Sequence, residues 1–239
     1  MFQWTDESID WWKRAVPYSD YYKILIRIFR EYLSRDETIF DIGCGLGNVS
    51  LELSPFVRRI KGFDINERVL NEFKKEIQRR GIDNISVSSE KWEKFKEPKC
   101  DTVIACSFGI MKNDLNSFLK IARKQVLVVR GRKEDPGMPV LPQGKEYRAG
   151  EEEKYLQEQK IPYYKRIVYA EFGQPLRSRE EAVEFVRFYG MNDEEKINAF
   201  LDNKLITLQQ GRDRYFLPNR KEVVIFVIPK EDRRDEKRK

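Results

Sequence analysis

The sequence contains no histidine, the side chain that most often transfers protons near neutral pH. Any general base must therefore be an Asp, Glu, Lys or Tyr side chain, or a water molecule. The three cysteines, Cys44, Cys100 and Cys106, have neither a Cys-x-x-Cys pair nor another spacing typical of zinc sites. We interpret them as free thiols in a reducing compartment and expect no metal centre.

Long apolar runs are absent as well, since no stretch approaches the roughly 20 residues that a membrane-spanning helix needs. The first residues of the chain are charged and lack the apolar region of a signal peptide. No internal repeat or low-complexity block occurs. We therefore expect a cytoplasmic protein without a membrane partner.

Charged side chains, by contrast, make up 36% of the residues. Enrichment in Lys, Glu and Arg is typical of heat-adapted protein surfaces, so we expect a thermophilic source. The 46 Lys and Arg residues face 40 Asp and Glu residues, which leaves a net charge of +6. This excess alone does not establish a nucleic-acid partner. The length of 239 residues is enough for one α/β domain with an elaboration.

The most informative stretch covers residues 38–47 and reads T-I-F-D-I-G-C-G-L-G. Its apolar residues around Asp41 are typical of a strand, and residues 48–53 resume at a helical spacing. Between them stand Gly43, Gly45 and Gly47. A glycine-rich turn from a strand into a helix lets backbone N–H groups approach a ligand, because no Cβ is in the way. The alternative is a tight turn without a ligand.

A second strand is predicted over residues 59–65, with Asp64 near its end. In a βαβ unit, an acidic residue about 20 residues after the glycines binds the ribose hydroxyls of a nucleoside. The alternative role for Asp64 is to cap the next helix, which we predict over residues 66–80 and which ends at Gly81.

The identity of the nucleoside follows from the details of the motif. A dinucleotide fingerprint needs Gly or Ala where Asn48 stands. The pattern D-x-G-x-G-x-G from Asp41, followed by Asp64, instead resembles motif I and the next acidic motif of class I S-adenosylmethionine-dependent methyltransferases. The resemblance covers residues 19–130, about half of the chain, and does not extend to a subfamily.

The resemblance implies S-adenosylmethionine as cofactor and S-adenosylhomocysteine as product. It implies that the three glycines cradle the methionine portion, that Asp41 orders the loop or reaches the amino group, and that Asp64 holds the ribose. Cys44 and Ile65, which adjoin these residues, complete this part of the expected cofactor site.

A third strand is predicted over residues 85–89 and leads into Lys91 and Trp92, which we also assign to the cofactor site. Methyltransferases of this class often carry an acidic residue here that reaches the adenine amino group. This sequence has Lys91 at that place, with Glu90 beside it. Two interpretations of Trp92 stay open: it stacks on the adenine, or it is an ordinary core aromatic.

The fourth strand is predicted over residues 100–107, and its last residues, Cys106 and Ser107, complete the expected cofactor site. The resemblance implies that a backbone carbonyl here holds the methionine end. The strand lacks the Asn/Asp-Pro-Pro-aromatic signature of adenine or glutamine amino methylation, and the Pro-Cys pair of RNA cytosine C5 enzymes. We therefore interpret Cys106 as a small buried residue, and no catalytic residue is identified.

Alternating strands and helices predict an α/β fold with a doubly wound, mostly parallel seven-stranded sheet. The resemblance implies a Rossmann-like methyltransferase fold. We expect a helix capped by Asn113 or Asp114, then a strand over residues 125–130. Two further helices, starting at Ser178 and near residues 192–195, form an insertion between the last two strands of the sheet.

The expected segments are an N-terminal helical lid (1–36), the cofactor-binding core (37–130), the rest of the sheet with the acceptor-side insertion (131–229) and a charged tail (230–239). Residues 131–150 are rich in Pro and Gly and predict a loop. Short strands are predicted over residues 205–208 and 215–217. The insertion supplies aromatic residues that either line the acceptor side or pack in the core: Phe172, Phe185, Phe188 and Tyr189.

For the acceptor we expect a small molecule, methylated by in-line displacement. One alternative is a tRNA or rRNA methyltransferase. The pI near 9.0 and the basic clusters at residues 58–59, 79–80 and 130–133 would suit it. Because acidic residues are interleaved with these clusters, we interpret them as solvated surface. A second alternative is a non-catalytic S-adenosylmethionine-binding partner protein. A nicotinamide oxidoreductase fits least, because Asn48 stands where the dinucleotide fingerprint needs Gly or Ala.

Overall fold

The structure is a computed structural model that describes residues 4–95, 99–133 and 149–230. Most of the predicted loop over residues 131–150 and almost all of the predicted tail over residues 230–239 lie outside the described residues. The chain divides into two compact units. The core unit comprises Tyr22–Arg130, Ala149–Ile167 and Val224–Lys239, and the insertion unit comprises Met1–Tyr21, Gly131–Arg148 and Val168–Val223.

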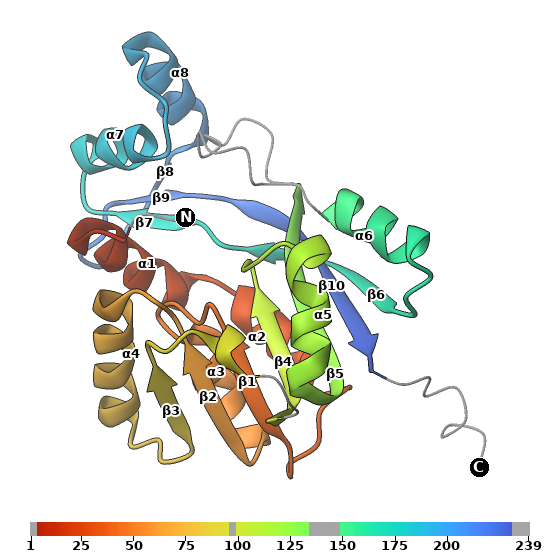
Figure 1. Cartoon of the computed structure of the whole chain (residues 1–239). Helices are drawn as coiled ribbons and strands as arrows, with labels where there is room; N and C mark the ends of the chain where they lie inside the picture. Colours follow the sequence, from red (N-terminus) through yellow and green to blue (C-terminus); the bar gives the residue numbers. More distant parts are fainter. Residues whose placement is uncertain (1–3, 96–98, 134–148, 231–239) are drawn as a thin grey trace. The chain divides into compact units, whose positions relative to one another are not determined.

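The main element of the fold is a seven-stranded sheet with the order β3-β2-β1-β4-β5-β10-β6 (Figure 1). The pairs β1–β2, β2–β3, β1–β4 and β4–β5 are parallel, which confirms the predicted doubly wound, mostly parallel α/β sheet. The strands are β1 (Thr38–Ile42), β2 (Arg59–Phe63), β3 (Ile85–Ser88), β4 (Cys100–Cys106), β5 (Ala122–Lys133), β6 (Tyr164–Glu171) and β10 (Arg220–Pro229).

Strand β10 runs against its neighbours. The backbone N–H of Lys230, just after β10, donates to the carbonyl of Lys124 near the start of β5. At the other end, the N–H of Phe172, just after β6, donates to the carbonyl of Asn219, just before β10. β10 is therefore antiparallel to both β5 and β6.

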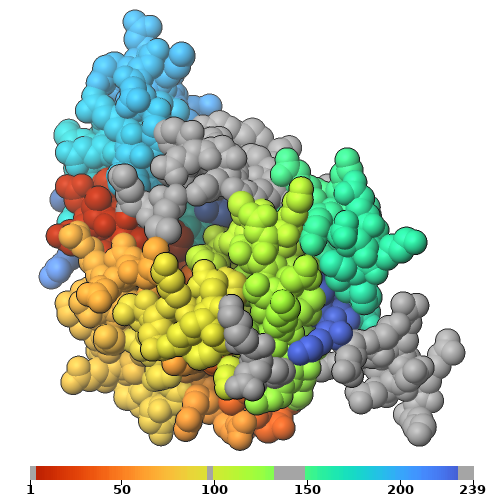
Figure 2. All heavy atoms as spheres, viewed as in Figure 1, coloured from red at the N-terminus to blue at the C-terminus, as the bar shows by residue number. Residues whose placement is uncertain are grey.

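The helices of the core unit pack on this sheet. They are α2 (Tyr21–Phe29, whose first residue belongs to the other unit), α3 (Asn48–Leu53), α4 (Glu67–Arg80), α5 (Met111–Ile121) and α6 (Ala149–Glu158). In Figure 1, α5 lies in front of β4 and β5, on the viewer's side of the sheet, and Figure 2 shows α5 and α6 (light green and blue-green) as neighbouring parts of the surface. The core beneath them includes Val103, Val126, Phe118, Leu156 and Phe226. Each such fully buried side chain contributes roughly 1.5–3 kcal/mol.

Helix α4 illustrates how local sequence sets the helix ends. The side chain of Asn66 accepts hydrogen bonds from the N–H groups of Arg68 and Val69 and so caps the first turn. Gly81 ends the helix with φ +63°, a left-handed conformation that favours glycine. The inward face buries Val69, Leu70 and Phe73. The prediction of a helix over residues 66–80 is confirmed.

Helix α5 corrects one prediction. It begins at Met111, so neither Asn113 nor Asp114 is its N-cap. The Asp114 carboxylate instead accepts a hydrogen bond from the backbone N–H of Ile110, and the N–H of Met111 donates to Glu152 on α6. The contact to Glu152 joins residues 41 positions apart, which the local pattern does not reveal.

The insertion unit contains α1 (Asp6–Tyr18), α7 (Arg179–Phe188), α8 (Glu194–Lys204) and a three-stranded sheet with the order β7-β9-β8. Its strands, Gln174–Leu176, Tyr215–Leu217 and Ile206–Thr207, pair antiparallel. Ser178 caps α7, as predicted. The cap of α8 is Asp193, within the predicted start at residues 192–195. The chain between β6 and β10 thus carries a small sheet of its own in addition to the two predicted helices.

The aromatic residues of the insertion unit mostly pack on one another. Phe185 is 6% exposed, and its ring centroid lies 5.3 Å from that of Trp11. Phe188 and Tyr189 join the same cluster, and Phe172 packs on Trp12 with centroids 4.9 Å apart. For Phe185 the structure therefore supports the core role of the two that the sequence left open.

None of the helices within residues 4–95, 99–133 and 149–230 is both long and apolar enough to cross a membrane.

Candidate functional site

The glycine turn lies at the carboxyl end of β1. Gly43, Gly45 and Gly47 have φ values of +71°, +52° and +75°. The backbone N–H groups of Gly43 and Cys44 donate to the carbonyl of Phe63 at the end of β2, at 2.8 and 3.0 Å. The turn therefore needs glycine at three alternate positions, because L side chains rarely adopt this left-handed conformation.

Two of these glycines also leave room for an aromatic ring. A Cβ on Gly43 would lie 2.1 Å from the ring of Phe108, and a Cβ on Gly47 would lie 2.2 Å from the ring of Phe73 on α4. Gly47 is thus needed for the packing of α4, a role that the sequence analysis did not assign to it. Gly43 lies at the edge of the turn that faces the loop after β4.

The Asp64 carboxylate joins the end of β2 to the glycine turn. It accepts a hydrogen bond from the N–H of Gly45 at 3.0 Å and another from the N–H of Asn66 at 2.9 Å. The helix-cap alternative for Asp64 is wrong, because the side chain of Asn66 caps α4. Each carboxylate oxygen has further lone pairs, so half-buried Asp64 can accept additional bonds from a ligand.

Asp41 lies behind the turn. It is 2% exposed, and the hydroxyl of Ser50 on α3 donates to its carboxylate at 2.6 Å. Burial raises the pKa of Asp41 to about 6, the bond from Ser50 lowers it, and the charge of Asp64 raises it further. Burial, with the charges of Asp41 and Asp64, also raises the pKa of the Cys44 thiol well above its ordinary value. Cys44 is therefore a neutral thiol and not a nucleophile.

The loop after β4 lies at the same edge of the sheet. Cys106 ends the strand, and the N–H of Ser107 donates to the carbonyl of Val129 on β5 at 3.0 Å. Ser107 has φ +54°, an unusual conformation for a residue other than glycine, and Gly109 has φ +75°. Between them, Phe108 places its ring against Gly43. Parallel β1 and β4 thus bring two sequence motifs more than 60 residues apart into contact.

Residues 39–127 match a protein family described as "Methyltransferase domain". This segment runs from β1 through the first part of β5, and so contains the glycine turn, Asp64 and the loop after β4. Residues 39–127 therefore form a methyltransferase domain.

Solved structures share the fold of this chain. The YcgJ protein from Bacillus subtilis matches with a TM-score of 0.52 at 14% identity, over 84% of this chain and 97% of that one. A candidate type II methyltransferase from Anaeromyxobacter dehalogenans matches with a TM-score of 0.54 at 18% identity, over 87% and 95%. A candidate methyltransferase from Bacillus halodurans gives 0.52 at 16%, over 83% and 94%.

Several hydrogen bonds bring part of the expected cofactor site together. Asp64 bonds to Gly45, and Gly43 and Cys44 bond to the end of β2. Ile65, beside Asp64, leaves 58% of its surface exposed, which is unusual for a large apolar side chain next to such a turn. Cys106 ends β4 and Ser107 begins the loop after it. The prediction that Cys106 is buried is wrong, because the residue is half-buried at this edge of the sheet.

The end of β3 is arranged differently. Trp92 is 6% exposed and packs against Phe118 of α5 with ring centroids 4.8 Å apart, so the structure supports its core role. Lys91 is exposed and precedes the short helix η2 (Trp92–Lys94). Glu90 forms ion pairs with Lys94 and Lys61.

One residue of the core unit was not foreseen at this edge, Arg130. The sequence analysis assigned Arg130 to a basic, solvated cluster, but the residue is 5% exposed and its guanidinium reaches the loop after β4. The available signal was its position directly after the apolar run V-L-V-V of a buried strand. If the buried strand continues through this position, the charged side chain there is buried as well.

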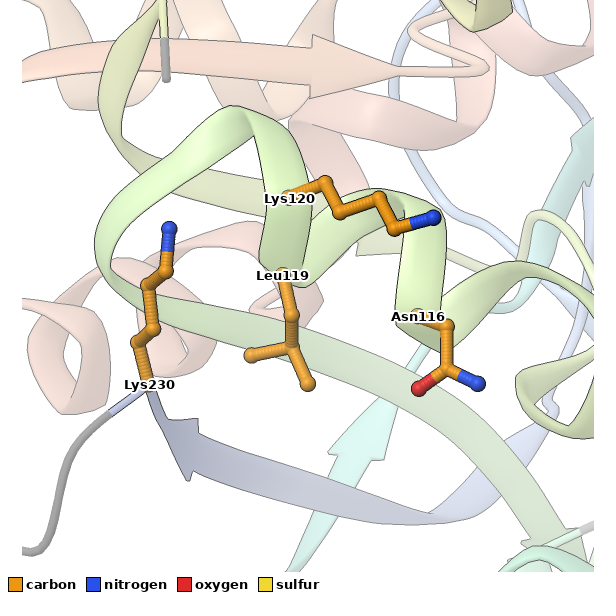
Figure 3. A pocket seen from close by; sticks show the side chains of 4 residues that line it. All are labelled: Asn116, Leu119, Lys120 and Lys230. Atoms are coloured by element: carbon orange, nitrogen blue, oxygen red, sulfur yellow. The ribbon is translucent and has the colours of Figure 1, made fainter. Parts of the chain in front are cut away.

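A surface hollow of about 430 Å³ lies elsewhere on the core unit (Figure 3). Asn116, Leu119, Lys120 and Lys230 line it, and the Lys230 ammonium donates to the carbonyl of Ala122 at the start of β5. The hollow thus lies at the amino end of β5, whereas the glycine turn follows the carboxyl end of β1, which runs in the same direction. The hollow is therefore at the opposite edge of the sheet from the predicted cofactor site.

Proposed function

We propose that this protein transfers the methyl group of S-adenosylmethionine to a small-molecule acceptor, with S-adenosylhomocysteine as product. The observation that carries the proposal is the Asp64 carboxylate, which is bonded to the glycine turn at the carboxyl edge of the parallel sheet. Ligands of open α/β sheets bind outside this edge. The match of residues 39–127 to methyltransferase domains supports the same cofactor.

The residues present fit this cofactor. Asp64 offers free lone pairs to the ribose hydroxyls, and exposed Ile65 offers an apolar surface to the adenine. Lys91, which is exposed after the end of β3, would border this side of the site, whereas Trp92 packs in the core. Gly43, Cys44 and Gly45 would lie along the methionine portion, and Cys106 and Ser107 would border its end. Asp41, bonded to Ser50, orders the turn from behind.

When bound, S-adenosylmethionine supplies a methyl group on a positively charged sulfur, which an acceptor lone pair can displace. The protein contributes mainly by holding the acceptor in line with that bond and by excluding water. Because the sequence has no histidine, an acceptor with a free lone pair at neutral pH suits this site best.

The charges of the core unit favour a small acceptor over RNA. Arg79 and Arg80, one of the basic clusters, form ion pairs with Glu76, and Arg80 also pairs with Glu52. Arg130, which belongs to another, is buried. RNA binding depends on free cationic groups that contact phosphates. A tRNA affinity that falls steeply with salt would support the RNA alternative instead.

Calorimetric titration with S-adenosylhomocysteine and, in parallel, NADH tests the cofactor assignment. We expect micromolar binding of the first and no response to the second. Asp64→Ala removes the charged acceptor and should weaken binding by about 1–3 kcal/mol, or roughly 5- to 150-fold. Asp83→Ala, an exposed acid in the turn before β3, is the control and should leave the affinity unchanged.

An unchanged affinity of the Asp64→Ala variant would contradict the role of Asp64. Transfer of a labelled methyl group from S-adenosylmethionine to fractionated small metabolites then tests catalysis. Tight cofactor binding without transfer to any fraction or to tRNA would favour the non-catalytic partner.

A further inference from the structure

We propose that Arg130 is a positioning residue of the cofactor pocket, which holds the loop after β4 so that Phe108 forms a wall against Gly43. This inference rests on the proposed function, because it concerns the same pocket. Arg130 belongs to β5, and its neighbour Val129 pairs with Cys106, the last residue of β4. The guanidinium is therefore at the carboxyl edge of the sheet.

The guanidinium satisfies all its N–H donors within the protein. One terminal nitrogen, Nη1, donates to the carbonyls of Ala105 and Val129 at 3.2 and 2.9 Å. The other, Nη2, donates to the carbonyls of Phe108 and Gly109 at 2.8 and 3.4 Å. Arg has five N–H donors in a rigid planar fork, so these contacts fix the path of the loop in several directions at once.

The remaining donor, Nε, faces Glu152 on α6, with its two carboxylate oxygens at 3.0 and 2.8 Å. The side chains of Arg130 and Glu152 are only 6% and 4% exposed. Glu152 also accepts the bond from the N–H of Met111 at the start of α5. The buried pair therefore holds both ends of the loop between β4 and α5.

This loop requires such support. Ser107 adopts the left-handed φ of +54°, which stores strain that the surrounding contacts must hold. At Gly109, with φ +75°, a Cβ would lie 2.7 Å from the Asp114 carboxylate. Strained backbone of this kind persists where neighbouring groups fix it, and it is frequent at ligand sites.

The consequence for the pocket passes through Phe108. Its carbonyl bonds to Arg130, and its ring lies against the first glycine of the turn. If the guanidinium no longer holds that carbonyl, the ring loses its fixed position beside the methionine portion of the ligand. Arg130 thus acts on cofactor affinity without touching the cofactor.

The test uses Arg130→Lys, which keeps a positive charge beside Glu152 but cannot form the planar fork. We expect its dissociation constant for S-adenosylhomocysteine to rise at least fivefold, with faster hydrogen exchange at the amides of residues 108–110. Phe108→Ala should weaken binding as well. In the Phe108→Ala background, Arg130→Lys should add less than a twofold further loss, because both act through the same ring.

Glu37→Gln is the matched control. Glu37 is 2% exposed and accepts bonds from Thr102 and Lys124, next to the start of β1 and away from the loop. It should lower the melting temperature and leave the dissociation constant within twofold. If Arg130→Lys does not fold, Glu152→Gln replaces it in the test. This substitution removes the carboxylate that faces Nε of Arg130, and should raise the dissociation constant in the same way.

If Arg130→Lys binds S-adenosylhomocysteine as tightly as the wild type does, this inference is wrong and the proposed function still stands. The inference is also wrong if Phe108→Ala and Arg130→Lys raise the dissociation constant independently, so that their effects multiply in the double variant. It is wrong as well if Glu37→Gln raises the dissociation constant as much as Arg130→Lys does. Tighter binding by Phe108→Ala would show that the ring occupies the place of the ligand, and would also overturn it. A wild-type protein that binds no S-adenosylhomocysteine would overturn the proposed function first, and this inference with it.

Discussion

At the scale of single residues, the two acids of the glycine turn have opposite surroundings. Asp64 is half-buried and accepts two backbone N–H bonds. Asp41 is almost fully buried, and its carboxylate accepts a hydrogen bond from the hydroxyl of Ser50. The same side chain therefore serves two purposes: Asp64 can offer charge to a ligand, whereas Asp41 carries a charge that the fold disfavours.

Asp41 should make stability depend on pH. Its pKa rises on folding from the ordinary 3.8 to about 6, so the folded state binds the proton more tightly than the unfolded state. Its contribution to stability is complete below pH 4 and is lost as the pH rises through 6. Relative to Asp41→Asn, which stays neutral, the wild type should lose up to about 3 kcal/mol between pH 4 and pH 7.

Urea denaturation of both proteins at several pH values measures this difference. Ser50→Ala should shift the loss to higher pH, because the hydroxyl bond favours the ionised form. Parallel stability curves for the wild type and Asp41→Asn would show that the Asp41 pKa does not change on folding.

At the scale of elements, the packing of α4 on the glycine turn explains why the third glycine is needed. Gly47 and Gly81 both adopt left-handed φ, at +75° and +63°. A Cβ on Gly47 would collide with the ring of Phe73, whereas a Cβ on Gly81 would have no neighbour within 4 Å. The two glycines therefore share the conformational requirement and differ in packing.

Alanine at each position should separate these two effects. Gly81→Ala should cost about 1–2 kcal/mol for the left-handed conformation alone. Gly47→Ala should cost at least about 2 kcal/mol more, because overpacking of a buried contact adds to it. Chemical denaturation of the two variants checks the difference. Equal losses would mean that Phe73 moves aside freely.

At the scale of the whole molecule, each of the two units has buried apolar residues of its own. The core unit buries the apolar faces of β4, β5, β10, α5 and α6. The insertion unit buries its own cluster, which joins Trp11 of α1 to α7 and α8. Residues from the beginning of the chain thus share an interior with residues more than 160 positions later.

A substitution among the buried residues of one unit should first lower the local stability of that unit. Leu201→Ala in the insertion unit and Leu70→Ala on α4 remove fully buried side chains, and each should cost about 2–5 kcal/mol. Hydrogen exchange should accelerate mainly in residues 174–217 for Leu201→Ala and mainly in residues 38–88 for Leu70→Ala. Equal acceleration in both regions for each variant would show that the two units open together.

The sequence alone determined the elements that depend on local chemistry. Alternating apolar runs gave the parallel strands, Asn66 and Gly81 gave the ends of α4, and the spacing of three glycines and Asp64 gave the cofactor motif. These signals work because a cap, a left-handed turn or a buried strand is decided by a few neighbouring residues.

Only the tertiary structure decided which residues meet across the sheet. Arg130 looked like surface charge until β5 placed it beside the β4 loop and Glu152 of α6. Trp92 was undecided until Phe118 packed on it, and the start of α5 depended on a bond from Met111 to Glu152. In each case the deciding partner is distant in sequence, and only the packing of strands and helices brings the two side chains within contact distance.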